Sequence, residues 1–459
     1  MNEVDVLIRA VDAGDTYLYW RWLDDPDRPE YTVLPAAELT ALLTRLVRAL
    51  PAQLSPTESR DEAARRALVT GELADPGRER ELSAALAAVI LPPALREQLA
   101  RRAAAGTAIR VRLTPSPRLA SVPWELLVVT PEHRLLDLAR IEHELPAAVH
   151  ADRAVTPRGW AARAEQPILA VIDPVLPAGL DGLSQTLEQD DVNSFTNRLF
   201  EYGDRVSEND LEVAIGARFT RVELSAALRT PRSRFLYFGH VSAKPDEPGS
   251  AALHLSDGEQ IWGRATPLAG NAGPAAHRPF SALDLFLGTH SADEAGWRPY
   301  GTGGPADGHV LWPMPPRVAV IACEGGADYR AMETFGLVVA MANAGAELIT
   351  TTRWVTPSTA AFRAVGMPTG SPTIDLALRV DAAHETEDPA AVLTAWQRDR
   401  LRHWCGGGDI GVADTPLIWA ALSTTVAKAR PGVPVPDSAA AGERARPVAA
   451  PPAVTGSRR

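Results

Sequence analysis

Two residues of the sequence, Cys323 and His240, combine reactive side chains with positions that suit nucleophilic catalysis. Cys323 ends the apolar run RVAVIAC and is followed by Glu324 and two glycines. His240 ends a second apolar run, SRFLYFGH. A cysteine nucleophile needs a nearby base or acid, and an imidazole titrates in the right range. If the two runs are neighbouring parallel strands, about 5 Å apart, both side chains reach one scissile bond.

The same two residues also have an ordinary structural interpretation. Cysteine is among the most often buried residue types, and a histidine at a strand end is often only hydrogen bonded. Gly325, which lets a substrate approach the backbone closely, favours a site. The second cysteine, Cys405, lies near His403, but two ligands do not complete a metal site, so we predict no metal.

Strands that alternate with helices must position these residues. From residue 167 onward, short apolar runs are separated by helical stretches, and the runs lie at 167–173, 233–240, 317–323 and 346–352. This alternation predicts an α/β fold with a mostly parallel sheet flanked by helices. Ligands bind beyond the carboxyl ends of such strands, which is where Cys323 and His240 stand.

The pattern divides the chain into three parts. Residues 1–105 read as paired strands followed by helices, and residues 106–429 hold the alternating pattern. Within the second part, residues 264–316 contain many glycines and prolines and are interpreted as an insert. Residues 430–459 have almost no large apolar side chains, which predicts a disordered tail that is dispensable for folding.

Composition excludes several classes of function. The chain has 459 residues and a net charge of −11, which argues against nonspecific nucleic-acid binding. Its two cysteines cannot form a disulfide framework, and its first residues lack the basic character of a signal peptide. The longest nearly apolar stretch, FGLVVAMANAGAELI, is too short and too polar to span a bilayer. We therefore expect a cytoplasmic protein with no membrane or nucleic-acid partner.

At these residues the sequence resembles the CHAT domain family of caspase-like proteins, grouped with separases and gingipain-type proteases. The blocks FLYFGHVSA and VAVIACEGG are similar to the two active-site blocks of that family. Further blocks are similar in the same order, and the whole resemblance covers about residues 105 to 425: LASVPWELLV, ILAVIDP, GLVVAMANAGAELITTTRW and TPLIWAAL.

The resemblance implies a caspase-like fold and cysteine peptidase activity without a cofactor. Cys323 falls on the family nucleophile and His240 on the family histidine. Backbone N–H groups of Val241 and Cys323 would stabilise the oxyanion. Val241 stands where such proteins usually have glycine. The candidates for substrate contacts are Asp173, Glu324, Gly325 and Trp354.

We therefore predict a CHAT-type cysteine endopeptidase that cuts a specific partner protein, with the N-terminal region packing on it or binding a regulator. A role in bacterial defence or cell death follows only by analogy with the family. The alternative is an inactive scaffold that keeps the fold and binds partners. Val241 favours the scaffold, whereas the presence of both His240 and Cys323 opposes it. A small-molecule hydrolase is a third alternative, but the sequence has no recognisable cofactor or phosphate motif.

The insert at 264–316 lies between the two candidate catalytic residues in the sequence. It leaves the predicted sheet after the His240 strand and returns just before the Cys323 strand. We expect it to act as a mobile cover of the site, with the apolar segment FSALDLFL (280–287) docking on the cleft at rest.

Overall fold

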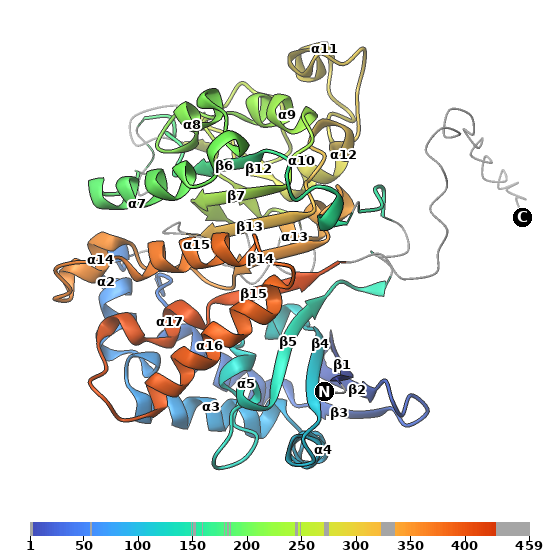
Figure 1. Ribbon diagram of the computed structural model, residues 1–459, viewed down its shortest axis with the longest axis vertical. Helices are drawn as coiled ribbons and strands as arrows, with labels where there is room; N and C mark the ends of the chain where they lie inside the picture. The colour runs from blue at the N-terminus through green and yellow to red at the C-terminus, as the bar shows by residue number, and fades with distance from the viewer. Residues whose placement is uncertain are drawn as a thin grey trace, which may run out of the picture.

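The central feature of the computed structural model is one ten-stranded sheet (Figure 1). The structure describes residues 3–427 apart from 56, 148, 150–152, 158, 179, 181–182, 184, 244–246, 248, 270–274 and 323–335. The strand order is β3-β2-β1-β4-β5-β15-β14-β13-β7-β6. Six of the neighbouring pairs are parallel and three are antiparallel, which confirms the predicted α/β class with a mostly parallel sheet.

The first half of the sheet comes from the N-terminal region and the residues that follow it. Its strands are β1 (Glu3–Ala13), β2 (Asp15–Trp22), β3 (Glu30–Leu34), β4 (Ala108–Thr114) and β5 (Ala139–Glu144). β1 and β2 form a hairpin around Gly14, whose φ of 77° suits a tight turn without a side chain. Alternate residues of β2 and β4 are buried, so these strands have one face on the core.

The second half of the sheet is buried on both faces. Its strands are β6 (Ile168–Ile172), β7 (Arg234–Gly239), β13 (Arg317–Ala322), β14 (Leu348–Thr352) and β15 (Leu422–Val426). Every residue of β6, β7, β13 and β14 is buried, as the continuous apolar runs predicted. The parallel register sets Ala322 opposite Gly239 and Ile172 opposite Phe238.

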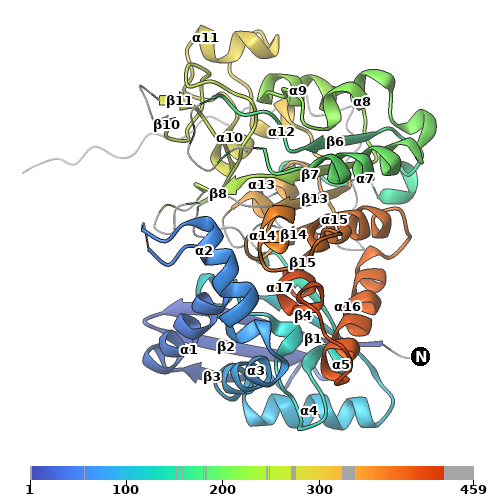
Figure 2. The same ribbon diagram turned by 90° about the vertical axis from the view of Figure 1, so that its left-hand side faces the viewer.

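One strand pair joins the two halves. β15 lies between β14, to which it is antiparallel, and β5, to which it is parallel. The strands of residues 1–105 therefore extend the same sheet that carries the candidate site. The helices expected in this region are present as α1 (Ala36–Ala49), α2 (Arg60–Arg65), α3 (Pro76–Ile90) and α4 (Pro93–Ala104). Figure 2 shows α1, α3 and α4 beside β1–β3 at one end of the molecule.

Helices cover both faces of the second half of the sheet. Leu236 and Phe238 of β7 pack into one apolar cluster, whereas Phe235 and Tyr237 pack into another. The first cluster takes side chains from α7 (Gln189–Phe200), α15 (Pro372–Ala383) and α16 (Pro389–Cys405). The second takes side chains from α9 (Arg221–Arg229) and α13 (Leu337–Asn343). Packing on both faces of the sheet holds the strand ends at fixed positions.

The described part of the insert is packed into the fold, so the expected loose cover is wrong for these residues. It forms β12 (Phe280–Ser281), α10 (Ala282–Leu287), α11 (Glu294–Trp297) and α12 (Gly308–Leu311). β12 pairs with β9 (Ala252–Leu253). Phe280 and Leu285 are fully buried in the same cluster as α13, and only Leu283 and Phe286 of the apolar segment are exposed. Its elements are too short to show a period in the sequence.

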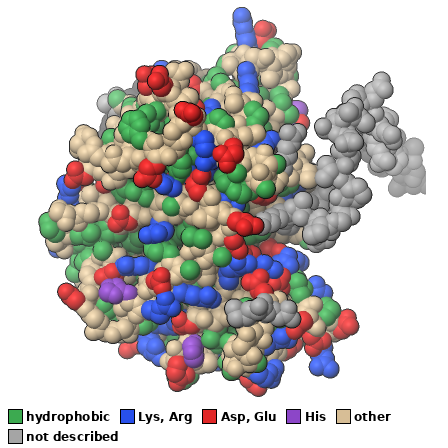
Figure 3. Space-filling view, viewed as in Figure 1, with side chains coloured by type: hydrophobic (Ala, Val, Ile, Leu, Met, Phe, Trp, Pro, Cys, Tyr) green, Lys and Arg blue, Asp and Glu red, His purple; other side chains and the backbone are tan. Residues whose placement is uncertain are grey.

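The surface is mixed in charge. Figure 3 shows basic and acidic side chains interspersed on the visible face, most densely over the half that contains β4, β5 and α16. Among the helices in the described part of the chain, none is both long and apolar enough to cross a membrane. The predicted tail at 430–459 lies outside the described residues.

Candidate functional site

His240 directly follows β7 and is buried at the carboxyl edge of the sheet. Its backbone is fixed from two sides. The hydroxyl of Tyr237 lies 2.7 Å from the His240 carbonyl oxygen and 2.9 Å from that of His254. The N–H of His254 donates to the same His240 carbonyl over 3.1 Å. These contacts tie the end of β7 to the segment that follows β9, and they hold the backbone of His240 in place.

Val241 begins the short strand β8 (Val241–Ser242), which pairs with β9. Its side chain is fully buried in the apolar cluster. Among the described residues other than glycine, only Asp173 and Ser291 have a positive φ. The backbone at Val241 therefore has a conformation open to any residue, and valine in place of glycine brings no strain there.

The strand β13 ends at Ala322, and the next three candidate residues, Cys323, Glu324 and Gly325, lie outside the described residues. The end of the strand itself is well defined. The N–H of Ala322 donates to Thr352 Oγ1 over 3.1 Å, and its carbonyl accepts from Thr356 Oγ1 over 2.9 Å. Together with the pairing to Gly239, these contacts fix the strand from which Cys323 continues.

Asp173 follows β6 and lies beside the end of β7, where its N–H donates to the Phe238 carbonyl over 2.6 Å. The side chain is buried, and Oδ2 accepts from the N–H groups of Thr186 and Leu187 over 2.8 and 3.0 Å. Burial raises the pKa of the carboxyl group. Among the described residues, Oδ1 has no hydrogen-bond partner. The structure thus gives Asp173 the role of anchoring residues 185–187 at the edge of the site.

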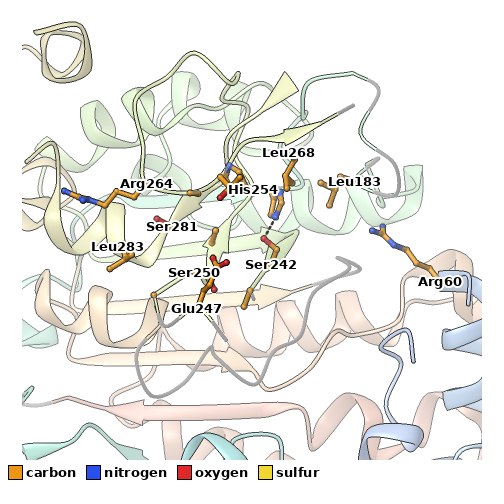
Figure 4. A pocket seen from close by; sticks show the side chains of 16 residues that line it. Arg60, Leu183, Ser242, Glu247, Ser250, His254, Arg264, Leu268, Ser281 and Leu283 are labelled. Carbon is orange, nitrogen blue, oxygen red and sulfur yellow. Dashed lines mark hydrogen bonds between the residues drawn. The ribbon is translucent and has the colours of Figure 1, made fainter. Parts of the chain in front are cut away.

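A pocket that the sequence did not reveal lies next to His240. Its volume is about 400 Å³, and its lining includes Ser242 and His254 (Figure 4). Nε2 of His254 lies 2.8 Å from Ser242 Oγ, and Nδ1 lies 3.1 Å from Nε2 of His277. The rings of His240 and His254 meet edge to face with centroids 6.5 Å apart.

The neutral form is favoured for both His254, in the wall of the pocket, and His277, behind it. Burial lowers the pKa of His254 well below its ordinary value, and it lowers that of His277 to about 4. The sequence offered no signal for this group of three residues, because Ser242, His254 and His277 follow no regular spacing and come from separate short strands and loops.

Comparison with known proteins identifies the family. Residues 80–367, more than half of the chain, match the family model of the CHAT domain. The chain belongs to the CHAT domain family. No curated protein matches it. Chains from two crystal structures of the Saccharomyces cerevisiae separase–securin complex, at 3.0 and 2.6 Å, are similar at 10% identity with TM-scores of 0.42 and 0.46. Each match covers 92% of this chain but only 30% of the solved chain.

Two segments within the matched residues 80–367 meet in the interior. Arg353 donates from Nη1 and Nη2 to the two carboxylate oxygens of Glu125, over 2.5 and 2.7 Å, and both side chains are buried. The neighbouring Trp354 is also buried, and its Nε1–H donates to the Leu417 carbonyl over 2.8 Å. A side chain buried in this way offers no surface to a substrate, so the contact expected of Trp354 is replaced by a packing role.

The second cysteine of the chain, Cys405, lies outside the residues that match the CHAT model. Cys405 ends α16 and is exposed, and partial burial of its thiol raises the pKa above the ordinary value. His403 lies 3.4 Å from Asp414 and is half exposed. In the part of the chain that the structure describes, no group of three or more His, Cys, Asp or Glu side chains could hold a metal ion.

Proposed function

We propose that this CHAT domain is a cysteine endopeptidase that cuts a specific partner protein in the cytoplasm, with Cys323 as nucleophile and His240 as acid and base. One observation carries the proposal. β7 and β13 are adjacent and parallel, and their last residues, Gly239 and Ala322, are register partners. In the sequence, His240 follows the first and Cys323 follows the second. The carboxyl edge of a parallel sheet is where substrates bind in such folds.

The proposed reaction needs only residues of the chain and water. The Cys323 thiolate attacks the peptide carbonyl carbon, and the C–N bond breaks to give a thioester and an amine. His240 transfers a proton to the departing nitrogen and then accepts one from the water that hydrolyses the thioester. N–H groups of Val241 and Cys323 are proposed to bind the oxyanion. Glu324 and Gly325, next to the nucleophile, are proposed substrate contacts.

Two features support a peptidase over an inactive scaffold. The first is that both family residues are present in the sequence. The second is that the backbone of His240 is held by the buried Tyr237 and by His254 in the segment after β9, as a positioned proton carrier requires. The feature that favoured a scaffold was Val241, and its backbone needs no glycine.

Mapping of new N-termini tests the proposal. The wild-type chain and the Cys323→Ala variant are each incubated with proteins encoded by neighbouring genes and with a lysate of the source cell. New N-termini in one or a few proteins, present with wild type and absent with Cys323→Ala, are the expected result. Cys405→Ala is the matched control and keeps the full pattern. The same cleavages with Cys323→Ala as with wild type would overturn the proposal.

A further inference from the structure

A hydrogen-bonded series of side chains leads from the pocket into the interior. It starts at Ser242, which lines the pocket, and passes through His254 to His277. It ends at the backbone of Asp257, whose carbonyl lies 2.8 Å from Nδ1 of His277. Figure 4 shows the imidazole of His254 directed at the Ser242 hydroxyl from the side of the pocket. The residues come from β8, from the loop after β9, and from β11 (Ala275–His277).

The direction of every hydrogen bond in the series follows from its last member. A carbonyl oxygen can only accept, so His277 carries its proton on Nδ1. A neutral imidazole has a single N–H, so Nε2 of His277 accepts from Nδ1–H of His254. Nε2 of His254 then carries no proton, so it accepts a hydrogen bond from the Ser242 hydroxyl. The serine proton therefore already lies on the path to a base whose tautomer is fixed.

We infer that Ser242 is a second nucleophile of this chain, which accepts acyl groups from activated esters, with His254 as its base and His277 as the positioning residue. A nucleophile bonded to a base, which is oriented by a third group, is the recurring arrangement of acyl-transfer sites. The site does not depend on Cys323, so it goes beyond the proposed peptidase activity.

The pocket suits an acyl chain of modest size. Its volume is about 400 Å³, within the range of small-molecule sites. Much of its wall is apolar, and Ser242 is among its polar members; the apolar side chains include Leu183, Ala243, Ala252, Leu268, Pro279 and Leu283. Arg60, Glu247 and Arg264 supply charge elsewhere in the lining. An apolar acyl group fits this wall, with its carbonyl carbon at Ser242 Oγ.

The reaction is a balanced acyl transfer. Ser242 Oγ bonds to the ester carbonyl carbon while its proton moves to Nε2 of His254. The bond from the carbonyl carbon to the leaving oxygen breaks, and that oxygen leaves with the proton from His254 as an alcohol or phenol. Water then attacks the acyl-serine, gives its proton through His254 to Ser242 Oγ, and releases the carboxylic acid.

The surroundings of His254 select the substrate class. Burial lowers the pKa of His254, which makes the imidazole a weak base, so the ester carbonyl must itself be reactive toward the serine oxygen. An activated ester, such as an aryl ester, has a leaving oxygen that departs with little help from an acid.

A fluorophosphonate probe and p-nitrophenyl butyrate test the inference in the full chain. The background is Cys323→Ala, so that a failed peptidase and a failed serine site are distinguished. We expect a phosphonyl adduct on Ser242 by peptide mapping and ester hydrolysis that is lost in Ser242→Ala. In His254→Gln the labelling rate should fall about 10²-fold.

A second buried serine–histidine pair supplies the matched control. Ser423 Oγ lies 2.6 Å from Nδ1 of His143, but Ser423 is buried within β15. Ser423→Ala should leave labelling unchanged. Absence of an adduct on Ser242 in protein with a normal melting curve would overturn the inference, as would an equal rate in folded His254→Gln.

One further variant covers the case in which His254→Gln does not fold. The chain has only two cysteines, so a Cys323→Ala/Cys405→Ala background has none. Ser242→Cys then introduces a single thiol next to His254. We expect its reaction with iodoacetamide to be about tenfold faster than that of the thiol introduced by Ser423→Cys. Equal rates would count against an activating role of His254.

Discussion

The two ends of β7 and β13 differ sharply in the kind of polar group that they hold. At the amino end, the first residues are the arginines Arg234 and Arg317, both almost fully buried. Arg234 pairs with Asp381 over 2.9 Å and with Glu385 over 3.0 Å. At the carboxyl end stand His240 and, beyond it, the neutral His254. Arginines with fixed partners begin both strands, whereas a histidine directly follows the last residue of β7.

The residues that position the strands and the residues proposed for catalysis therefore lie at opposite ends of β7 and β13. An arginine keeps its proton at any working pH, so a buried arginine can only orient what it binds. Arg317 illustrates this, because it donates to the carbonyls of His384 and Thr386 over 2.6 and 2.5 Å and stacks on Trp160. The amino end therefore fixes the position of the strands, and the carboxyl end holds the residues that we propose for catalysis.

The largest effect is expected at the carboxyl end, on activity alone. His240→Ala should lower the rate of peptide cleavage by about 10²- to 10⁴-fold, the usual contribution of a positioned acid–base group. The melting temperature should change little, because the strand itself is held by Tyr237 and by the neighbouring strands. Cleavage of the physiological substrate and thermal melting are the two measurements. His403→Ala, at the exposed end of α16, is the control and should change neither. Cleavage by His240→Ala at the wild-type rate would rule out the proposed mechanism.

The opposite outcome is expected at the amino end. Asp381→Ala should destabilise the fold by about 3–5 kcal/mol, because it leaves the buried Arg234 without its nearest carboxylate. Asp381 also accepts from Arg198 Nε over 2.7 Å, which adds to the loss. Urea unfolding measures the change.

An exposed ion pair calibrates this stability prediction. Asp399→Ala breaks the contact with Arg402, in which both side chains are about two-thirds exposed, and should cost less than about 1 kcal/mol. Similar losses for Asp381→Ala and Asp399→Ala would show that the amino end is not the rigid base that we infer.

The two cysteines extend the comparison to reactivity. At neutral pH, iodoacetamide should label Cys323 before Cys405, although Cys405 is exposed. The pKa of Cys405 is raised by partial burial, so its thiolate is scarce at neutral pH and its labelling should accelerate as the pH rises toward that pKa. Peptide mass mapping at several pH values gives both rates. Preferential labelling of Cys405 at pH 7 would contradict the assignment of the nucleophile.

The contrast also explains what could be predicted from the sequence. The strands β6, β7 and β13 were predicted because each lies in a nearly continuous apolar run, which is the pattern of a strand buried on both faces. The position of His240 followed from such a run. The pairing of β15 with β5, which joins the two halves of the sheet, was not predicted, because strand pairing between distant segments leaves no local pattern.

Short secondary-structure elements and contacts between distant side chains could not be predicted from periodicity in the sequence. Phe280 and Leu285 belong to a two-residue strand and a six-residue helix, which are too short to show a period, so the segment was misread as a mobile cover. Trp354 was taken for a substrate contact because an aromatic residue in a family block gives no sign of its burial. Ser242 and His254 become neighbours only through the pairing of β8 with β9.

The smallest expected effect concerns the residue that links both proposed sites. The buried hydroxyl of Tyr237 contacts the carbonyls of His240 and His254. Tyr237→Phe keeps the ring and leaves two carbonyls without this donor, which should cost about 1 kcal/mol of stability. Because both histidine backbones then gain freedom, peptide cleavage and fluorophosphonate labelling should each slow, about tenfold, through kcat with little change in KM. Tyr300→Phe removes a hydroxyl from the same apolar cluster and should leave both rates unchanged. If Tyr237→Phe lowered stability while both rates stayed at the wild-type level, Tyr237 would be a packing residue, and the rigidity of the carboxyl edge would come from the strands alone.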